Sequence, residues 1–232
     1  NAKQINWQKP AKKTAQFRLT GRYNKRVLTD AFSLTGAGLN LEGAVDYAEQ
    51  EKFKSLSISK LQVDDILDVF GQFNPAMGIE IFGGWVNFPN LMAGMPETNA
   101  AQTAPLALKV ALDEVVLGEN KLTEFRADLI SAPQLSGPFS AKVNGVAQVV
   151  AVLSPLNGRT ALEVTSEQAG RLLTSVGALQ SATGGQLKLN LTPTQQMGET
   201  DGLLEIRNVK VQKAPVFAER LNAIRLVGFL EQ

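Results

Sequence analysis

A chain of 232 residues with 44% hydrophobic and 19% charged residues has the composition of a folded globular protein with a substantial core. Its formal net charge of +1 gives no general case for binding nucleic acid, which requires a strongly basic surface. The absence of cysteine and histidine excludes a Ser-His-Asp triad, a Cys-His dyad, a Cys/His zinc site and a histidine general base.

The carboxylates that remain offer no obvious acid/base couple. Asp64 and Asp65 are adjacent, as are Asp113 and Glu114, and adjacent residues on a strand point to opposite faces. No phosphate-binding or calcium-binding loop motif is present, and no apolar run reaches the roughly 18 residues of a membrane span. We therefore expect a non-catalytic chain with no cofactor and no metal. A carboxylate-only glycosidase is the enzymatic alternative, and it would need a polar cleft with two facing carboxylates.

Period-two alternation of apolar with polar or small residues recurs along most of the chain and predicts β-strands. Turns rich in Gly, Asn or Pro separate these segments, and no long helices are interleaved, which favours a large antiparallel sheet over a parallel α/β architecture. In chain order, the alternating sets are Phe17/Leu19, Phe32/Leu34, Leu39/Leu41, Val45/Tyr47, Leu56/Ile58, Ile79/Ile81, Leu106/Leu108/Val110/Leu112, Phe125/Ala127/Leu129, Phe139/Ala141/Val143, Leu162/Val164 and Leu187/Leu189/Leu191.

The alternation changes phase at two places, between Ile58 and Leu61 and between Ile206 and Val209. A slip of one residue would turn the apolar set to the other face of the sheet, so each place predicts a β-bulge that bends its strand. The expected fold is therefore mainly β, with a curved, bulged antiparallel sheet.

Short amphipathic helices are expected to cap this sheet. Residues 64–73 carry apolar side chains at helical spacing. Thr165 and Gln168 have the spacing of a capping box, ahead of a helix that ends near Gly184. Ala214-Pro215 opens the last helix, since proline is favoured in a first turn. The apolar stripe of this expected lid helix contains Phe217, Leu221 and Ile224.

We expect one continuous sheet made of two parts. Residues 1–103 form an N-terminal β-rich part with a short helix near 64–73, and residues 104–232 form a second β-rich part with lid helices. The sequence starts at Asn1 and stops inside a helical pattern, so we expect it to be a fragment of a longer polypeptide.

The C-terminal part carries an ordered series of motifs. GGQLKLNLTPT at residues 184–194 contains a G-x-L-x-L strand, and GETDGLLEIRNVKVQKAPVFAERL at residues 198–221 contains a G-x-L-x-I-x-N strand, an A-P and the start of a helix. This series resembles the AsmA-like C-terminal region of the AsmA, TamB and YhdP type of bacterial envelope protein. The resemblance covers about residues 104–232 and is looser over residues 1–103. At residues 64–73 the chain departs from the family pattern, which has a continuing strand there.

The resemblance implies that the sheet forms an open groove or half-pipe, with residues 104–232 as its C-terminal β-groove part. Such a groove spans the periplasm from an inner-membrane anchor and moves phospholipids between the inner and outer membranes. Its partners would be phospholipid acyl chains, the remainder of its own longer chain with the anchor, and other envelope proteins. If this applies here, the residues expected to line the groove are Leu187, Leu189, Leu191, Leu204 and Ile206. The alternative is a structural or scaffolding β-module of an envelope assembly, in which the same apolar residues fill a closed core without lipid.

Overall fold

The computed structural model describes residues 14–21, 29–48, 52–94, 104–194 and 199–211. Strands make up 69% of the described residues and helices 8%, and the sheet is curved and not closed, which confirms the predicted fold class. The chain divides into two compact units. Unit 1 comprises Asn1–Thr98 and Ala107–Leu117, and unit 2 comprises Asn99–Leu106 and Gly118–Gln232.

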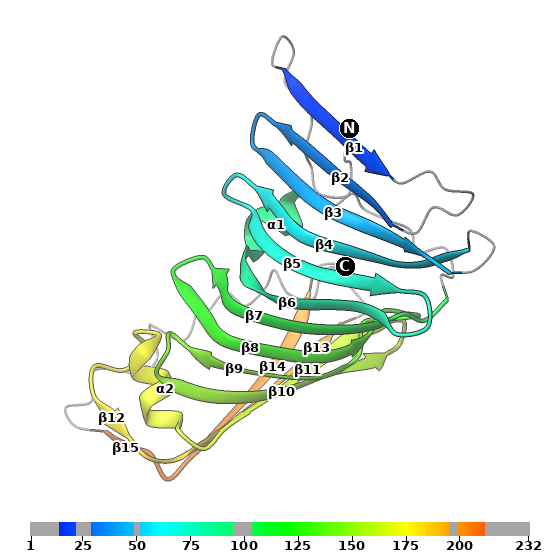
Figure 1. Cartoon of the computed structure of the whole chain (residues 1–232). Helices are drawn as coiled ribbons and strands as arrows, with labels where there is room; N and C mark the ends of the chain where they lie inside the picture. The colour runs from blue at the N-terminus through cyan, green and yellow to red at the C-terminus, as the bar shows by residue number, and fades with distance from the viewer. Residues whose placement is uncertain (1–13, 22–28, 49–51, 95–103, 195–198, 212–232) are drawn as a thin grey trace. The chain divides into compact units, whose positions relative to one another are not determined.

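Unit 1 is a sheet whose strands lie side by side in chain order (Figure 1). All neighbouring pairs within it are antiparallel except β6 and β7, which are parallel, so the sheet is mixed where the sequence predicted an antiparallel one. A parallel pair needs a crossover connection, and helix α1 lies in that connection. The elements are β1 (Ala15–Gly21), β2 (Thr29–Gly36), β3 (Leu39–Tyr47), β4 (Phe53–Val63), β5 (Leu67–Asn74), β6 (Gly78–Asn87), α1 (Phe88–Gly94) and β7 (Ala107–Leu117).

The first predicted bulge is confirmed in β4. Glu42 of β3 pairs with Lys60, whereas the next residue, Gly43, pairs with Ile58, so Ser59 is the extra residue. The Ser59 hydroxyl donates to the Glu42 carbonyl oxygen at 3.2 Å, which holds the bulged residue against β3. This extra residue explains why the apolar alternation changes phase between Ile58 and Leu61.

The predicted helix at residues 64–73 is wrong. A tight turn at Asp64–Ile66 is closed by the Ile66 N–H donating to the Val63 carbonyl oxygen at 2.8 Å, and β5 follows from Leu67. Leu67 and Val69 are buried on one face, and β5 pairs with β4 and with β6. The apolar residues at this position satisfy both periods, and the ladders on both sides select the strand over the helix.

Unit 2 has an antiparallel sheet in the order β8-β9-β10-β11-β13-β14 and, apart from it, the two-stranded pair β12-β15. Helix α2 lies between β11 and β12 in the chain and contacts β10, β12 and β13. The elements are β8 (Asn120–Ile130), β9 (Gly137–Val143), β10 (Ala147–Leu156), β11 (Arg159–Ser166), α2 (Ala169–Ser175), β12 (Ala182–Thr183), β13 (Gln186–Pro193), β14 (Thr200–Arg207) and β15 (Lys210–Val211).

The second predicted bulge is wrong, because the chain leaves the sheet there. Strand β14 ends at Arg207, and Asn208 adopts a positive φ of 58°. Asparagine tolerates this left-handed conformation better than most residues, so the chain can turn sharply. Val211 of β15 then pairs with Ala182 of β12 in the two-stranded sheet.

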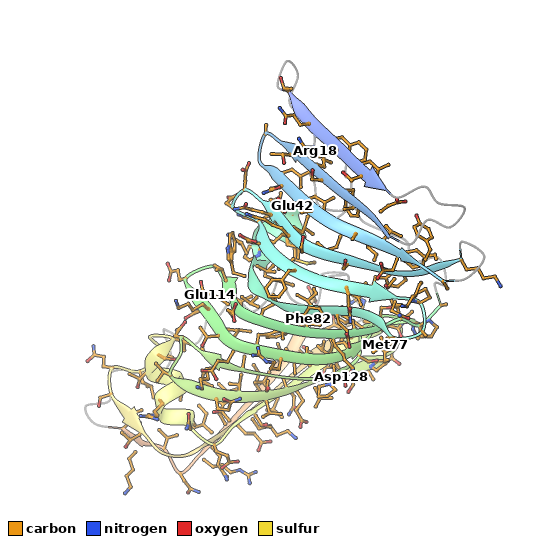
Figure 2. The ribbon with its side chains drawn as sticks, in the orientation of Figure 1. Arg18, Glu42, Met77, Phe82, Glu114 and Asp128 are labelled. Carbon is orange, nitrogen blue, oxygen red and sulfur yellow. The ribbon has the colours of Figure 1, made fainter. Side chains whose placement is uncertain are left out.

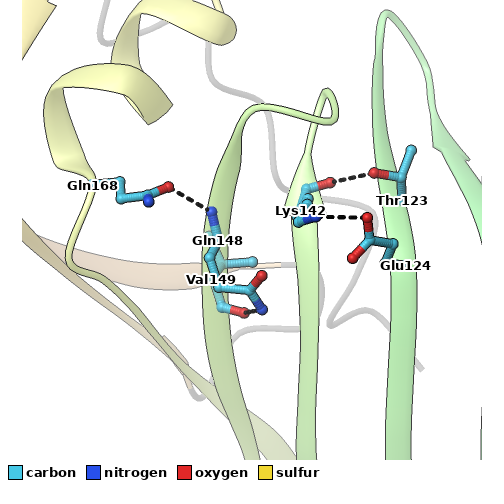
Figure 3. Close-up of polar contacts among 6 residues, drawn as sticks. All are labelled: Thr123, Glu124, Lys142, Gln148, Val149 and Gln168. Atoms are coloured by element: carbon cyan, nitrogen blue, oxygen red, sulfur yellow. Dashed lines mark hydrogen bonds and ion pairs between the residues drawn. The ribbon is translucent and has the colours of Figure 1, made fainter.

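The predicted capping box is also wrong. Thr165 belongs to β11, where its hydroxyl donates to the Val150 carbonyl oxygen at 3.3 Å. Gln168 is the N-cap residue of α2 without any side-chain capping bond, and its side-chain oxygen accepts the Gln148 N–H at 3.1 Å (Figure 3). The helix ends at Ser175, well before Gly184. Because Thr165 is held between two ladder partners, it is not available to cap a helix.

Candidate functional site

One face of the unit 1 sheet is apolar from strand to strand, and we call it the apolar face of unit 1. The residues opposite one another in the register form rows across the sheet. The row nearest α1 is buried, with side chains 2–8% exposed. It consists of Leu39, Val63, Leu67, Val86 and Val115.

Burial on this face decreases along the strands, away from the α1 end. Beyond one intervening row, the side chains of the next two rows are only half-buried. These rows consist of Phe32, Gly43, Ile58, Gly71, Ile81 and Val110, and of Val45, Leu56, Phe73, Ile79 and Leu108. At the far end, Phe53 is 43% exposed and stacks on Phe73 with ring centroids 5.9 Å apart. Unit 1 therefore has an apolar face that is closed at one end and accessible to solvent at the other.

Unit 2 has an apolar face as well, and there burial varies from strand to strand. The central strands β9 and β10 contribute side chains that are 0–8% exposed. They are Phe139, Ala141, Ala147, Val149, Ala151 and Leu153. On the outermost strand, β14, Leu204 and Ile206 are half-buried. The accessible part of this face therefore lies at its β13–β14 side.

The residues predicted to line a groove are brought together on β13 and β14. Leu187 pairs with Ile206, and Leu189 pairs with Leu204, while Leu191 pairs with Gly202. Leu187 is 7% exposed, and the other four candidates are half-buried. The residues predicted for the lid helix, Phe217, Leu221 and Ile224, lie outside the described residues.

Sequence reasoning named no site residue in unit 1. The half-buried rows around Ile58, Ile81 and Val110 have the same apolar character as the β13–β14 side chains. The period-two alternation was visible in these strands, and it could have identified them. The motifs that resemble the AsmA-like region lie mainly in the C-terminal part, so the predicted groove residues were confined to it.

The opposite face of unit 2 is mainly polar along β11, β13 and β14, and two ion pairs form there. Lys188 contacts Glu163 at 2.8 Å, and Arg207 contacts Glu205 at 2.9 Å. A shallow depression of about 220 Å³ lies among these side chains. It is lined by Thr165, Glu167, Gln186, Leu187, Lys188, Glu205 and Arg207. Each of these ion pairs is partly exposed to solvent, which is the pattern of a solvated surface.

Within the described part of the chain, no three residues from among His, Cys, Asp and Glu are grouped so that they could hold a metal ion. No helix in the described ranges is long and apolar enough to cross a membrane. Comparisons of the chain with known protein families, with curated proteins and with solved structures give no match.

Proposed function

We propose that the chain is a non-catalytic lipid-binding segment whose apolar faces hold phospholipid acyl chains. The observation that supports this most directly is the incomplete burial of an otherwise continuous apolar face in each unit, in a sheet that is not closed. A sheet face filled by its own core would have its large side chains buried throughout. Half-buried rows of Ile, Leu, Val and Phe leave apolar surface that an acyl chain could cover.

The energetics are compatible with this role. Each CH₂ group buried from water contributes about 0.8 kcal/mol, so two acyl tails laid along an apolar face could offset much of the cost of leaving a bilayer. Together with the AsmA-like motif order, this supports a role in moving phospholipids between the two membranes of a bacterial envelope. Under this proposal the segment works in the periplasm, as part of a longer chain anchored in the inner membrane.

A structural module is the second candidate, and the centre of unit 2 favours it. Ala141, Ala147 and Ala151 are at most 1% exposed, and Leu153 and Leu162 are 4% exposed. This part of the sheet is as fully buried as a closed core. If the β13–β14 side is covered, the same strands would serve only as a scaffold.

Mass spectrometry of an organic extract separates the two candidates. Phospholipid is expected in near-equimolar amount in the purified chain and should be lost from a Leu189→Glu, Ile206→Glu variant, because a carboxylate on the apolar face repels acyl chains. Leu203→Glu is the matched control, since Leu203 lies in the same strand, is 58% exposed and should keep its lipid.

Circular dichroism of each variant shows whether it is folded. If the wild-type chain carries no lipid, or if the double variant unfolds while Leu203→Glu stays folded, then these side chains belong to a closed core. In that case the scaffold function replaces the lipid-binding one.

A further inference from the structure

The face of unit 1 opposite its apolar face, which we call the outer face, carries two exposed aromatic side chains. Phe70 of β5 is 44% exposed and Phe82 of β6 is 49% exposed, and their ring centroids lie 6.3 Å apart. Figure 2 labels Phe82 on this part of the sheet. Both residues alternate with side chains of the apolar face, so neither is needed to build it.

A β-bulge in β6 places these rings together. Phe70 pairs with Gly83, whereas the next residue, Gly71, pairs with Ile81, so Phe82 is the extra residue. Bulges re-aim side chains, and here the bulge brings Phe82 beside Phe70. Gly83 leaves room for this arrangement, because a Cβ atom at this position would lie 2.9 Å from the Phe70 ring and the ring would have to shift. The local backbone is therefore arranged so that two rings share one patch of solvent-exposed surface.

Carboxylates flank the rings. Asp113 of β7 accepts the Gly84 N–H at 3.0 Å, and the same carboxylate oxygen would be 3.6 Å from a Cβ atom at Gly83. The Asp113 carboxylate is therefore held on the side of Gly83 that borders β7. One row further along, Trp85 of β6 pairs with Asp68 on one side and Glu114 on the other. Negative charge thus lies next to exposed aromatic surface.

Two lysines of the outer face lie near the patch. Lys60 of β4 lies opposite Phe70 and pairs with Glu42 of β3. Lys109 of β7 pairs with Glu80, which already accepts a hydrogen bond from the Gln72 side-chain amide at 2.6 Å. The row of Asp68, Trp85 and Glu114 has no basic member. Acidic side chains therefore outnumber basic ones around the rings, with Glu42, Asp68, Glu80, Asp113 and Glu114 against Lys60 and Lys109.

We propose that Phe70 and Phe82, flanked by Asp68 and Asp113, form a docking surface for an arginine-rich amphipathic segment of a partner protein. A guanidinium group stacks on aromatic faces and pairs with carboxylates, which are the two chemistries present here. Apolar side chains of the same segment would cover the rest of the exposed rings. This surface does not depend on lipid binding, because it lies on the opposite face of the sheet.

The test uses the whole chain and two fluorescein-labelled amphipathic 14-residue peptides with the same leucine positions. One peptide has arginine at every polar position and the other has glutamate. Fluorescence anisotropy should show binding of the arginine peptide that falls with rising salt, and no binding of the glutamate peptide. In a Phe70→Ser, Phe82→Ser variant the affinity for the arginine peptide should fall by about tenfold or more.

Two further variants make the test specific. Asp68→Asn, Asp113→Asn keeps the side-chain shape and should weaken binding about threefold and flatten the salt dependence. The matched control is Val150→Ser, Val152→Ser in unit 2, since these side chains are 48% and 42% exposed and should leave binding unchanged.

Three outcomes would overturn the proposal. The first is equal affinity for both peptides, and the second is unchanged binding after loss of the two phenylalanines. The third is binding of phosphatidylglycerol vesicles that depends on Phe70 and Phe82 and blocks the peptide, which would make the patch a membrane-contacting surface instead.

Discussion

Burial on the apolar face falls in different directions in the two units. In unit 1 it falls along each strand, from the buried row that contains Val63 to the half-buried rows that contain Ile58 and Leu56. In unit 2 it falls across the strands, from Val149 in β10 to Leu204 in β14. An acyl chain would therefore find accessible apolar surface at the strand ends away from α1 in unit 1, and on the outermost strands in unit 2.

The two helices contribute to this difference. Helix α1 contacts β6 and β7 at one end of unit 1, where the Asn87 N–H also donates to the Ile66 carbonyl oxygen at 2.7 Å. Helix α2 contacts β10 and β13 in unit 2 and lies close to the backbone of β12, since a Cβ atom at Gly170 would be 2.5 Å from the Thr183 nitrogen. Each helix thus packs near the most buried part of its unit.

The largest expected effect concerns the reactivity of introduced thiols. The natural chain has no cysteine, so single cysteines can be compared without background. Ile58→Cys should react with a maleimide about tenfold or more faster than Val63→Cys in the same strand, because the buried thiol reacts only after local opening. Leu204→Cys should likewise react faster than Val149→Cys in unit 2. Mass spectrometry over time gives the labelling rates, and equal rates for the two cysteines of a unit would contradict the burial gradient in that unit.

The second prediction compares one substitution in the two units. Leu153→Ala in β10 removes a side chain that is 4% exposed and should lower the free energy of unfolding by about 2–5 kcal/mol. Leu56→Ala in β4 removes a half-buried side chain, and about 1 kcal/mol is expected because less apolar surface is lost. Urea denaturation followed by circular dichroism measures both. A loss at Leu56 as large as that at Leu153 would mean that the accessible end of unit 1 is covered.

The third prediction separates two neighbours at the start of α2. Ser166 is 4% exposed, and its hydroxyl donates to the Gln148 carbonyl oxygen at 2.7 Å and accepts the Gln168 N–H at 3.2 Å. Ser166→Ala should lower the free energy of unfolding by about 1–3 kcal/mol, since the Gln148 carbonyl oxygen and the Gln168 N–H both lose their hydrogen-bond partner. Thr165→Ala should cost about 0.5–1 kcal/mol, because only one bond at the surface is lost. The capping box predicted from sequence would require the reverse order in the same urea experiment.

The sequence predicted most of the strands because their apolar residues alternate with a clear period of two. It failed where two periods overlap: residues 64–73 suit a helix or a strand, and only the ladders to β4 and β6 decide between them. The break after Arg207 depends on the positive φ of Asn208, which the apolar pattern does not reveal. The parallel pairing of β6 with β7 was missed because a crossover can reverse the direction of a strand without leaving a signal in either strand.

The candidate site was predictable in part. Pairing of β13 with β14 follows from two adjacent alternating segments, and it brings the five predicted leucine and isoleucine side chains onto one face. Which of them are buried was not predictable, because burial depends on neighbours from distant strands such as β10 and β11. The aromatic patch of unit 1 was missed for a similar reason, since Phe70 and Phe82 meet through the bulge at Phe82.

The smallest expected effect concerns the ion pair between Lys188 and Glu163 on the polar face of unit 2. Both side chains are almost half exposed, at 44% and 46%, so solvent screens their attraction. A double-mutant cycle with Lys188→Ala and Glu163→Ala should give a coupling free energy of about 0.2–1 kcal/mol. Leu189→Ala, at the position next to Lys188 but on the apolar face, should cost about 1–2 kcal/mol through lost apolar burial. If the coupling free energy exceeded the loss of unfolding free energy in Leu189→Ala, the polar face rather than the apolar one would hold β11 and β13 together. The accessible β13–β14 side would then have no need of a lipid to cover it.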